Sequence, residues 1–183
     1  MKKLIVTLAL GMACVSAFAQ GTLNFANVAS GLNAKIFLDS VGSATSPAGT
    51  GWIAQLWYGP AGSAESALIG LPTTATFSTI AAQTGYFTGG QRTIDTIAGG
   101  AAAVVQVRAW NAAAGATWDA AQLSPIGIAG RSSLFTINLA TPPATPANLV
   151  GLTSFALVSV PEPSSFALAG LGAAALLIFR RRK

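Results

Sequence analysis

The chain has 183 residues, of which 52% are hydrophobic and only 8% are charged. A charged fraction so far below the usual ~25% excludes proteins that stay disordered through charge repulsion. The absence of histidine removes the commonest general base and metal ligand. The formal net charge of +5 would suit an anionic partner such as nucleic acid. Whether it indicates such a partner depends on where the cations lie in the chain.

The first 19 residues have the three parts of a secretory signal peptide. A basic start (residues 1–3) precedes an apolar stretch (residues 4–15). Ala17 and Ala19 then form the small-residue pattern at which signal peptidase cuts, immediately before Gln20. We therefore expect export through the Sec translocon and a mature chain that begins at Gln20.

The only cysteine of the chain, Cys14, lies within this apolar stretch. Lipidation of Cys14, as in bacterial lipoproteins, is an alternative, but residues 11–13 lack the leucine usual at such a site. Cleavage after Ala19 instead leaves a mature chain without cysteine. The exported domain would then contain no disulfide and no reactive thiolate.

Residues 20–159 are expected to form one domain of about 140 residues, long enough to bury a core. Short stretches of alternating or β-branched and aromatic residues, separated by turn formers, indicate strands. Only residues 112–121 allow one or two helical turns. Without a βαβ rhythm, the sequence predicts an all-β domain, an antiparallel β-sandwich or jelly roll of about seven to nine strands. The clearest strand stretches are residues 22–27, 34–39, 52–58, 104–110, 134–139 and 153–158.

Two connections lack this alternation, residues 42–51 and residues 140–148. The second contains Pro142, Pro143 and Pro146, which have no backbone N–H to donate and therefore cannot lie in an interior strand. We expect both connections to be loops.

The C-terminal segment, residues 160–183, again has three parts. Its prolines fix φ and lack N–H groups, so the first part should be an extended peptide that a processing enzyme can bind. Residues 165–179 are uncharged, and as a helix they would cover roughly 23 Å of a ~30 Å bilayer core. The cations that follow should stay on the cytoplasmic side. The motif and the basic end comprise Val160, Pro161, Glu162, Pro163, Ser164, Arg180, Arg181, Arg182 and Lys183.

Motif, apolar stretch and basic cluster, in this order at a chain end, resemble the PEP-CTERM family of bacterial sorting signals. The resemblance covers about 25 residues. It implies recognition by an exosortase, a membrane-embedded cysteine protease and transpeptidase that would cut near Pro161–Pro163. It also implies an inner-membrane-anchored precursor that reaches the cell surface or extracellular matrix of a Gram-negative-type bacterium. The alternative is an ordinary single-span anchor on a proline-containing stalk.

The mature region is also similar to short exported proteins of Verrucomicrobia-type bacteria that carry the same kind of tail. That group has no assigned activity to transfer to this chain. The stretches behind this weaker resemblance are residues 21–25, 54–60, 106–110 and 149–152.

Most cations of the chain lie at its two ends. Two lie in the signal peptide and four follow residues 165–179, so processing at both ends removes six of the ten. The domain between them has as many acids as cations, and we therefore expect no nucleic-acid partner. These charged residues are Lys35, Arg92, Arg108, Arg131, Asp39, Glu65, Asp95 and Asp119.

The predicted mature domain offers few groups for catalysis. Its carboxylates are scattered along the chain, so a paired acid–base site would need a tertiary coincidence. We therefore expect no enzyme, no metal and no cofactor. The first function class is a structural or exopolysaccharide-associated protein of the cell envelope or matrix. The alternative is a carbohydrate-binding surface module in which exposed aromatic rings stack on sugars, with Trp52, Trp57, Tyr58, Tyr86, Trp110 and Trp118 as candidates.

Overall fold

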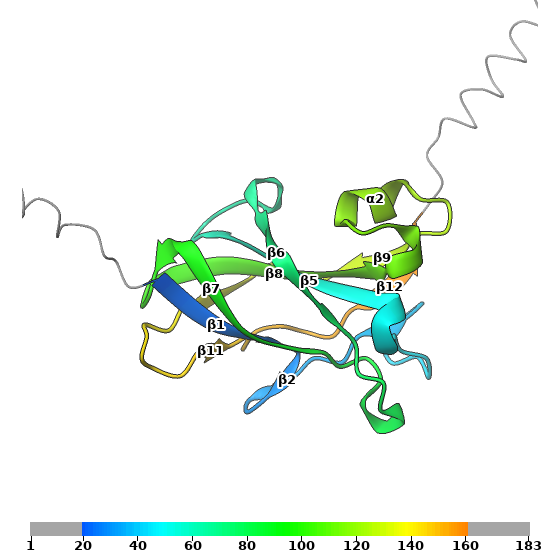
Figure 1. Cartoon of the computed structure of the whole chain (residues 1–183), viewed down its shortest axis with the longest axis horizontal. Helices are drawn as coiled ribbons and strands as arrows, with labels where there is room; N and C mark the ends of the chain where they lie inside the picture. The colour runs from blue at the N-terminus through cyan, green and yellow to red at the C-terminus, as the bar shows by residue number, and fades with distance from the viewer. Residues whose placement is uncertain (1–19, 161–183) are drawn as a thin grey trace, which may run out of the picture.

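The computed structural model describes residues 20–160, which form a mostly β domain (Figure 1). Within this range there are 12 strands in mixed sheets and one short α-helix. The predicted signal peptide, the predicted membrane span and the basic end lie outside the described residues. No helix within residues 20–160 is long and apolar enough to cross a membrane.

The larger sheet has seven strands in the order β4-β12-β9-β8-β5-β6, and β10 also pairs with β8. Strands β9 and β10 share one edge of β8, because β9 pairs with residues 108–110 and β10 with residues 102–105. The strands are β4 (Phe37–Leu38), β5 (Trp52–Pro60), β6 (Ile69–Thr76), β8 (Ala102–Asn111), β9 (Ile128–Arg131), β10 (Phe135–Asn138) and β12 (Ala156–Ser159).

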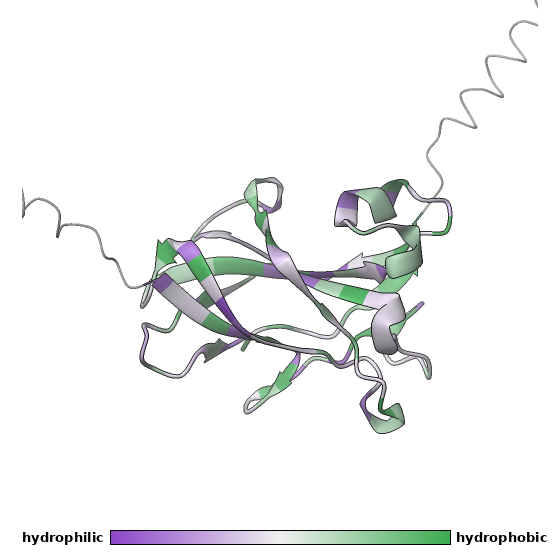
Figure 2. Cartoon of the chain, in the orientation of Figure 1, coloured by the Kyte–Doolittle hydropathy of each residue, from purple (hydrophilic) through white to green (hydrophobic). Residues whose placement is uncertain are grey.

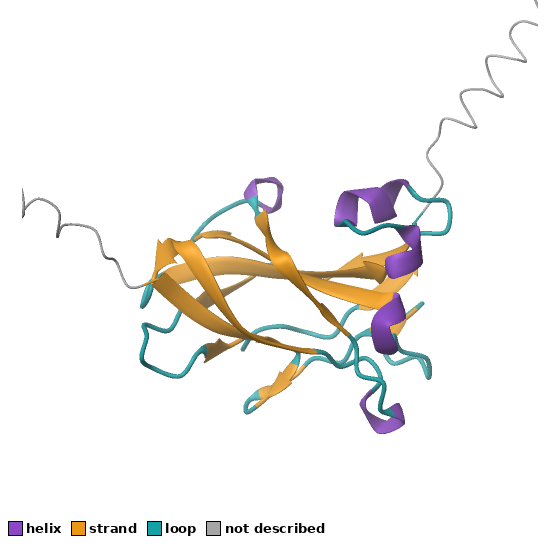
Figure 3. Ribbon diagram, in the orientation of Figure 1, coloured by secondary structure: helices purple, strands orange, loops and turns teal. Residues whose placement is uncertain are grey.

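The smaller sheet has three strands in the order β11-β1-β7, and a two-stranded hairpin, β2-β3, follows β1. Helical segments lie at the ends of strands and in the connections between them (Figure 3). The strands are β1 (Gln20–Ala26), β2 (Val28–Ala29), β3 (Leu32–Asn33), β7 (Thr88–Ala98) and β11 (Ala147–Asn148). The 3-10 helices are η1 (Gly49–Gly51), η2 (Glu65–Ala67), η3 (Ala81–Gln83) and η4 (Ala112–Ala114), and the α-helix is α2 (Trp118–Leu123).

The all-β expectation is confirmed as a mostly β domain. The purely antiparallel arrangement is wrong, and so is the expected number of seven to nine strands, because residues 20–160 contain 12. β11 runs parallel to β1, and β4 runs parallel to β12. Both β4 and β11 have only two residues, and each lies at an edge of its sheet. Each is also far along the chain from its parallel partner, β12 for β4 and β1 for β11. A long stretch of chain between two strands lets the second run in the same direction as the first, which a tight hairpin cannot do.

The main core lies between the apolar sides of the two sheets, and bands of hydrophobic and hydrophilic residues run along the strands (Figure 2). As the alternation predicts, Val105, Val107 and Ala109 of β8 face this core together. Leu23 and Phe25 enter it from β1. Burial of both sheets against each other therefore orders most of the domain.

A second, smaller cluster covers the other face of β8, where α2 packs. We call Trp110, Trp118, Ala121 and Ala129 the outer cluster. The rings of Trp110 and Trp118 meet edge to face at 6.1 Å. The Trp110 indole N–H donates to the carbonyl of Gly115 at 2.9 Å. The Thr117 hydroxyl caps α2 by accepting from the N–H of Ala120. The outer cluster thus fixes α2, and together with η4 this helix places helical turns in the stretch where the sequence allowed them, residues 112–121.

Candidate functional site

Most of the aromatic residues expected to stack on sugars are part of the packing. Trp110 is fully buried, and Tyr58 and Trp118 are each only 8% exposed. Trp52 is half-buried against the main core. Neighbouring side chains cover the ring faces that a sugar would have to contact, so these four residues do not fit a role in sugar stacking.

Trp57 is half-buried and its ring is covered by an arginine. The Arg108 guanidinium carbon lies 3.7 Å from the centre of the Trp57 ring. Arg108 also donates through Nε to Gln106 Oε1 at 2.8 Å and lies 3.6 Å from Glu65. Burial lowers the pKa of Arg108 below its usual value, and the charge of Glu65 opposes that shift. Glu65 also pairs with Arg131. The ion pairs of Glu65 with Arg108 and Arg131 thus stabilise the outer face of the seven-stranded sheet.

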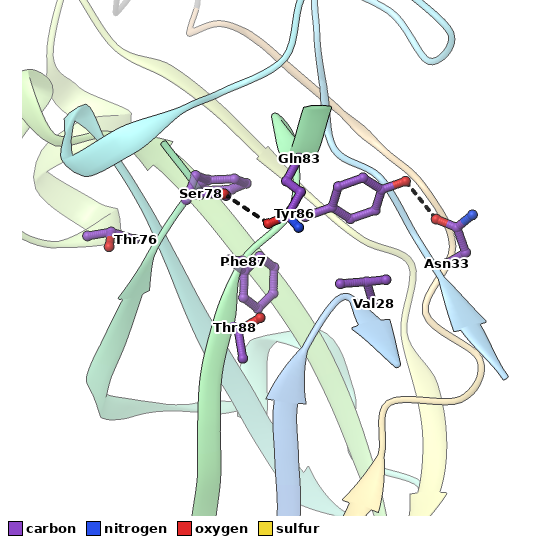
Figure 4. A pocket seen from close by; sticks show the side chains of 9 residues that line it. Val28, Asn33, Thr76, Ser78, Gln83, Tyr86, Phe87 and Thr88 are labelled. Atoms are coloured by element: carbon purple, nitrogen blue, oxygen red, sulfur yellow. Dashed lines mark hydrogen bonds between the residues drawn. The ribbon is translucent and has the colours of Figure 1, made fainter. Parts of the chain in front are cut away.

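Tyr86 lies in a different place, in a cleft of about 600 Å³ (Figure 4). The cleft lies where the β2-β3 hairpin, the end of β6, η3 and the start of β7 meet. None of its lining side chains is charged. They are Val28, Asn33, Thr76, Phe77, Ser78, Gln83, Tyr86, Phe87 and Thr88.

Polar contacts hold the side chains of the cleft. The Tyr86 hydroxyl donates to Asn33 Oδ1 at 2.8 Å, and the Ser78 hydroxyl donates to Gln83 Oε1 at 3.3 Å (Figure 4). Within residues 20–160, the amide nitrogens of Asn33 and Gln83 donate to no protein acceptor. The cleft therefore presents an aromatic ring beside amide N–H groups that can donate to a ligand.

The inner wall of the cleft depends on Asn27, a fully buried amide at the end of β1. Asn27 Nδ2 donates to the carbonyls of Ala34 and Gly85, and the Phe87 N–H donates to Asn27 Oδ1, all at 2.8 Å. The Phe87 ring in turn packs on Phe25 at 4.7 Å between ring centres. One side chain thus positions the residues on both sides of Tyr86.

The sequence identified Tyr86 among the aromatic candidates but did not identify the residues around it. Asn33, Ser78 and Gln83 carry no motif, and only the tertiary structure brings them to one cleft. The single sequence signal is an uncharged loop between aromatic residues, with Phe77 at its start and Tyr86 and Phe87 at its end.

Of the sorting motif, Val160 alone lies within the described residues. It follows β12 directly, and its N–H donates to the carbonyl of Gly127 at 2.8 Å. Its side chain packs against the outer cluster. At the other end, Gln20 is already the first residue of β1 and pairs with Ala98. The described part of the fold therefore includes both the first residue after the predicted cleavage site and the first residue of the motif.

The comparisons with known proteins agree with this C-terminal assignment. Residues 159–183 match the PEP-CTERM protein-sorting motif. No curated protein and no solved structure matches the chain at a significant level. The motif implies processing by exosortase, and PEP-CTERM proteins are exported and sorted to the cell surface. The chain is thus an exported protein that carries a PEP-CTERM sorting motif at its C-terminus.

Proposed function

We propose that the mature domain is a non-catalytic protein of the cell envelope or extracellular matrix that associates with exopolysaccharide through the cleft around Tyr86. The uncharged lining of this cleft carries the proposal. A neutral sugar offers hydroxyl acceptors to the Asn33 and Gln83 amides and an apolar ring face to the half-buried Tyr86 ring. A volume of about 600 Å³ is within the range of small-ligand sites.

The charges of the domain support a non-catalytic role. Glu65 is paired with Arg108 and Arg131. Asp39, Asp95 and Asp119 are exposed. The chain has no histidine to act as a base beside them. A passive structural protein of the envelope, without sugar binding, is the second candidate, and the large share of small uncharged residues favours it.

Replacing Tyr86 with alanine should weaken binding of the domain to its polysaccharide by about tenfold, since one aromatic stacking contact is worth about 1.5 kcal/mol. Tyr86→Phe keeps the ring and loses only the hydrogen bond to Asn33, so it should bind within about threefold of the wild type. A glycan array that includes the exopolysaccharide of the producing bacterium measures both. If the wild-type domain binds no glycan, the passive structural function replaces this proposal. If Tyr86→Ala binds glycan as well as the wild type, the binding does not use the cleft and the proposal is wrong.

Processing at both ends is tested by mass spectrometry of the protein taken from the native envelope. We expect an N-terminus at Gln20 and a C-terminus near Pro161–Pro163, without residues 165–183. A strain that lacks the exosortase should retain the tail. An intact Arg180–Lys183 end on most of the surface population would show a permanent anchor instead.

A further inference from the structure

The last strand of the domain ends in an apolar corner. Val160 is joined to Gly127 by a backbone hydrogen bond, and its side chain packs against the outer cluster. Gly127 closes the loop after α2, with its N–H donating to the carbonyl of Ser124 at 3.0 Å. The point at which the chain leaves the domain is therefore fixed to the loop that follows α2.

Three large apolar side chains are exposed around this point. Leu123, at the end of α2, is 71% exposed, Ile126 in the following loop is 60% exposed, and Val158 in β12 is 49% exposed. Val158 lies opposite Ala129, and Ala129 lies opposite Trp110. Opposite residues share a face of a sheet, so Val158 points to the same side as the outer cluster. We call Leu123, Ile126 and Val158 the exit patch.

The length of chain beyond the domain indicates what covers the exit patch. Only residues 161–164 separate Val160 from the uncharged stretch of residues 165–179. Even fully extended, this connection spans no more than roughly 17 Å. The headgroup layer on one side of a bilayer is roughly 5–8 Å thick. The exit patch of a membrane-anchored precursor therefore stays within reach of the lipid surface.

We infer that the exit patch docks on the lipid surface while the precursor is anchored in the membrane. A few aliphatic side chains bind a bilayer weakly, but the short tether keeps them at a high effective concentration there. Docking turns the α2 end of the domain towards the membrane and the start of β1 away from it (Figure 1). It also keeps residues 161–163 near the membrane surface, where a membrane-embedded protease acts. Removal of the tail ends the tethering, so the domain leaves the lipid.

This inference rests on the predicted membrane span, and the experiment tests both. The precursor from Gln20 to Lys183 contains no cysteine, so Leu123→Cys supplies a single site for an environment-sensitive fluorophore. The labelled precursor is reconstituted into vesicles of phosphatidylethanolamine and phosphatidylglycerol that contain a nitroxide lipid. Ile69→Cys is the matched control, because Ile69 is also well exposed, at 58%. It pairs with Tyr58 near the end of β5, whereas the outer cluster beside the exit patch lies next to the start of β5, where Ile53 pairs with Trp110.

We expect both labelled precursors to float with the vesicles, and the label at position 123 to be quenched roughly twofold more strongly than the label at position 69. Equal, weak quenching in chains that float would overturn the docking and leave the span intact. Failure to float would overturn the span and the docking together. Shielding of position 123 in native membranes but not in protein-free vesicles would assign the exit patch to a protein partner and overturn docking on lipid.

Discussion

Replacing Asn27 with aspartate is expected to lower the free energy of unfolding by about 3–5 kcal/mol, because each buried polar group left without a partner costs about 1–3 kcal/mol. Aspartate has nearly the same shape as asparagine, but its carboxylate cannot donate a hydrogen bond. It would face the carbonyls of Ala34 and Gly85, which now accept from the Asn27 amide. Urea denaturation followed by near-ultraviolet circular dichroism measures the loss.

The same change should disturb the cleft. Asn27 holds Gly85 and Phe87 in place, and these residues flank Tyr86. Asn138→Asp is the matched control, since Asn138 is exposed on β10, and its stability should change by no more than about 0.5 kcal/mol. If Asn27→Asp were as stable as Asn138→Asp, the buried amide would not be a stabilising centre of this fold.

Replacing Gly130 with alanine is expected to destabilise the domain by roughly 1–3 kcal/mol, the usual cost of overpacking a closely packed position. A Cβ atom at this position would overlap with the carbonyl oxygen of Ala156 and press on the Leu157 side chain. Strand β9 would then have to separate from β12. Denaturation gives the total loss, and hydrogen exchange at the Val160 N–H, which now donates to Gly127, reports the loosening next to the sorting motif.

The matched control for this substitution is Gly51→Ala. No atom lies within 4 Å of a Cβ built at Gly51, so its stability should stay within about 0.5 kcal/mol of the wild type. Faster exchange at Val160 in Gly130→Ala alone would locate the damage at the β9–β12 pair. Unchanged exchange, or equal stability of the two variants, would contradict the close approach of these strands.

Local patterns predicted the central strands well. Residues 104–110 alternate clearly, and β8 has its two faces as expected, with Val105 and Val107 in the main core. Residues 34–39 alternate as well, yet only Phe37 and Leu38 form a strand there. Alternation shows which residues share a face but not whether a neighbouring strand is present to pair with them.

The strands that the sequence did not reveal have weaker patterns. β7 is the longest strand, but glycines and exposed polar residues occupy most of its length. It becomes a strand because β1 pairs with it along nearly its whole length. β11 lies inside the connection expected to be a loop, at residues 147–148, and forms only where it meets β1. Both segments are therefore strands because they pair with β1, which is distant from them in the sequence.

The sorting segment at residues 159–183 could be identified from the sequence because translocation and proteolysis act on it as a linear peptide. Charge order, apolar length and proline spacing carry that information directly. The candidate cleft was decided by the tertiary structure, because Asn33, Ser78 and Tyr86 come together only when the hairpin after β1 meets the ends of β6 and β7. Burial likewise decided which aromatic residue can bind a ligand. The sequence makes Trp110 and Tyr86 equal candidates, but in the folded domain Trp110 is fully buried and Tyr86 is half-exposed.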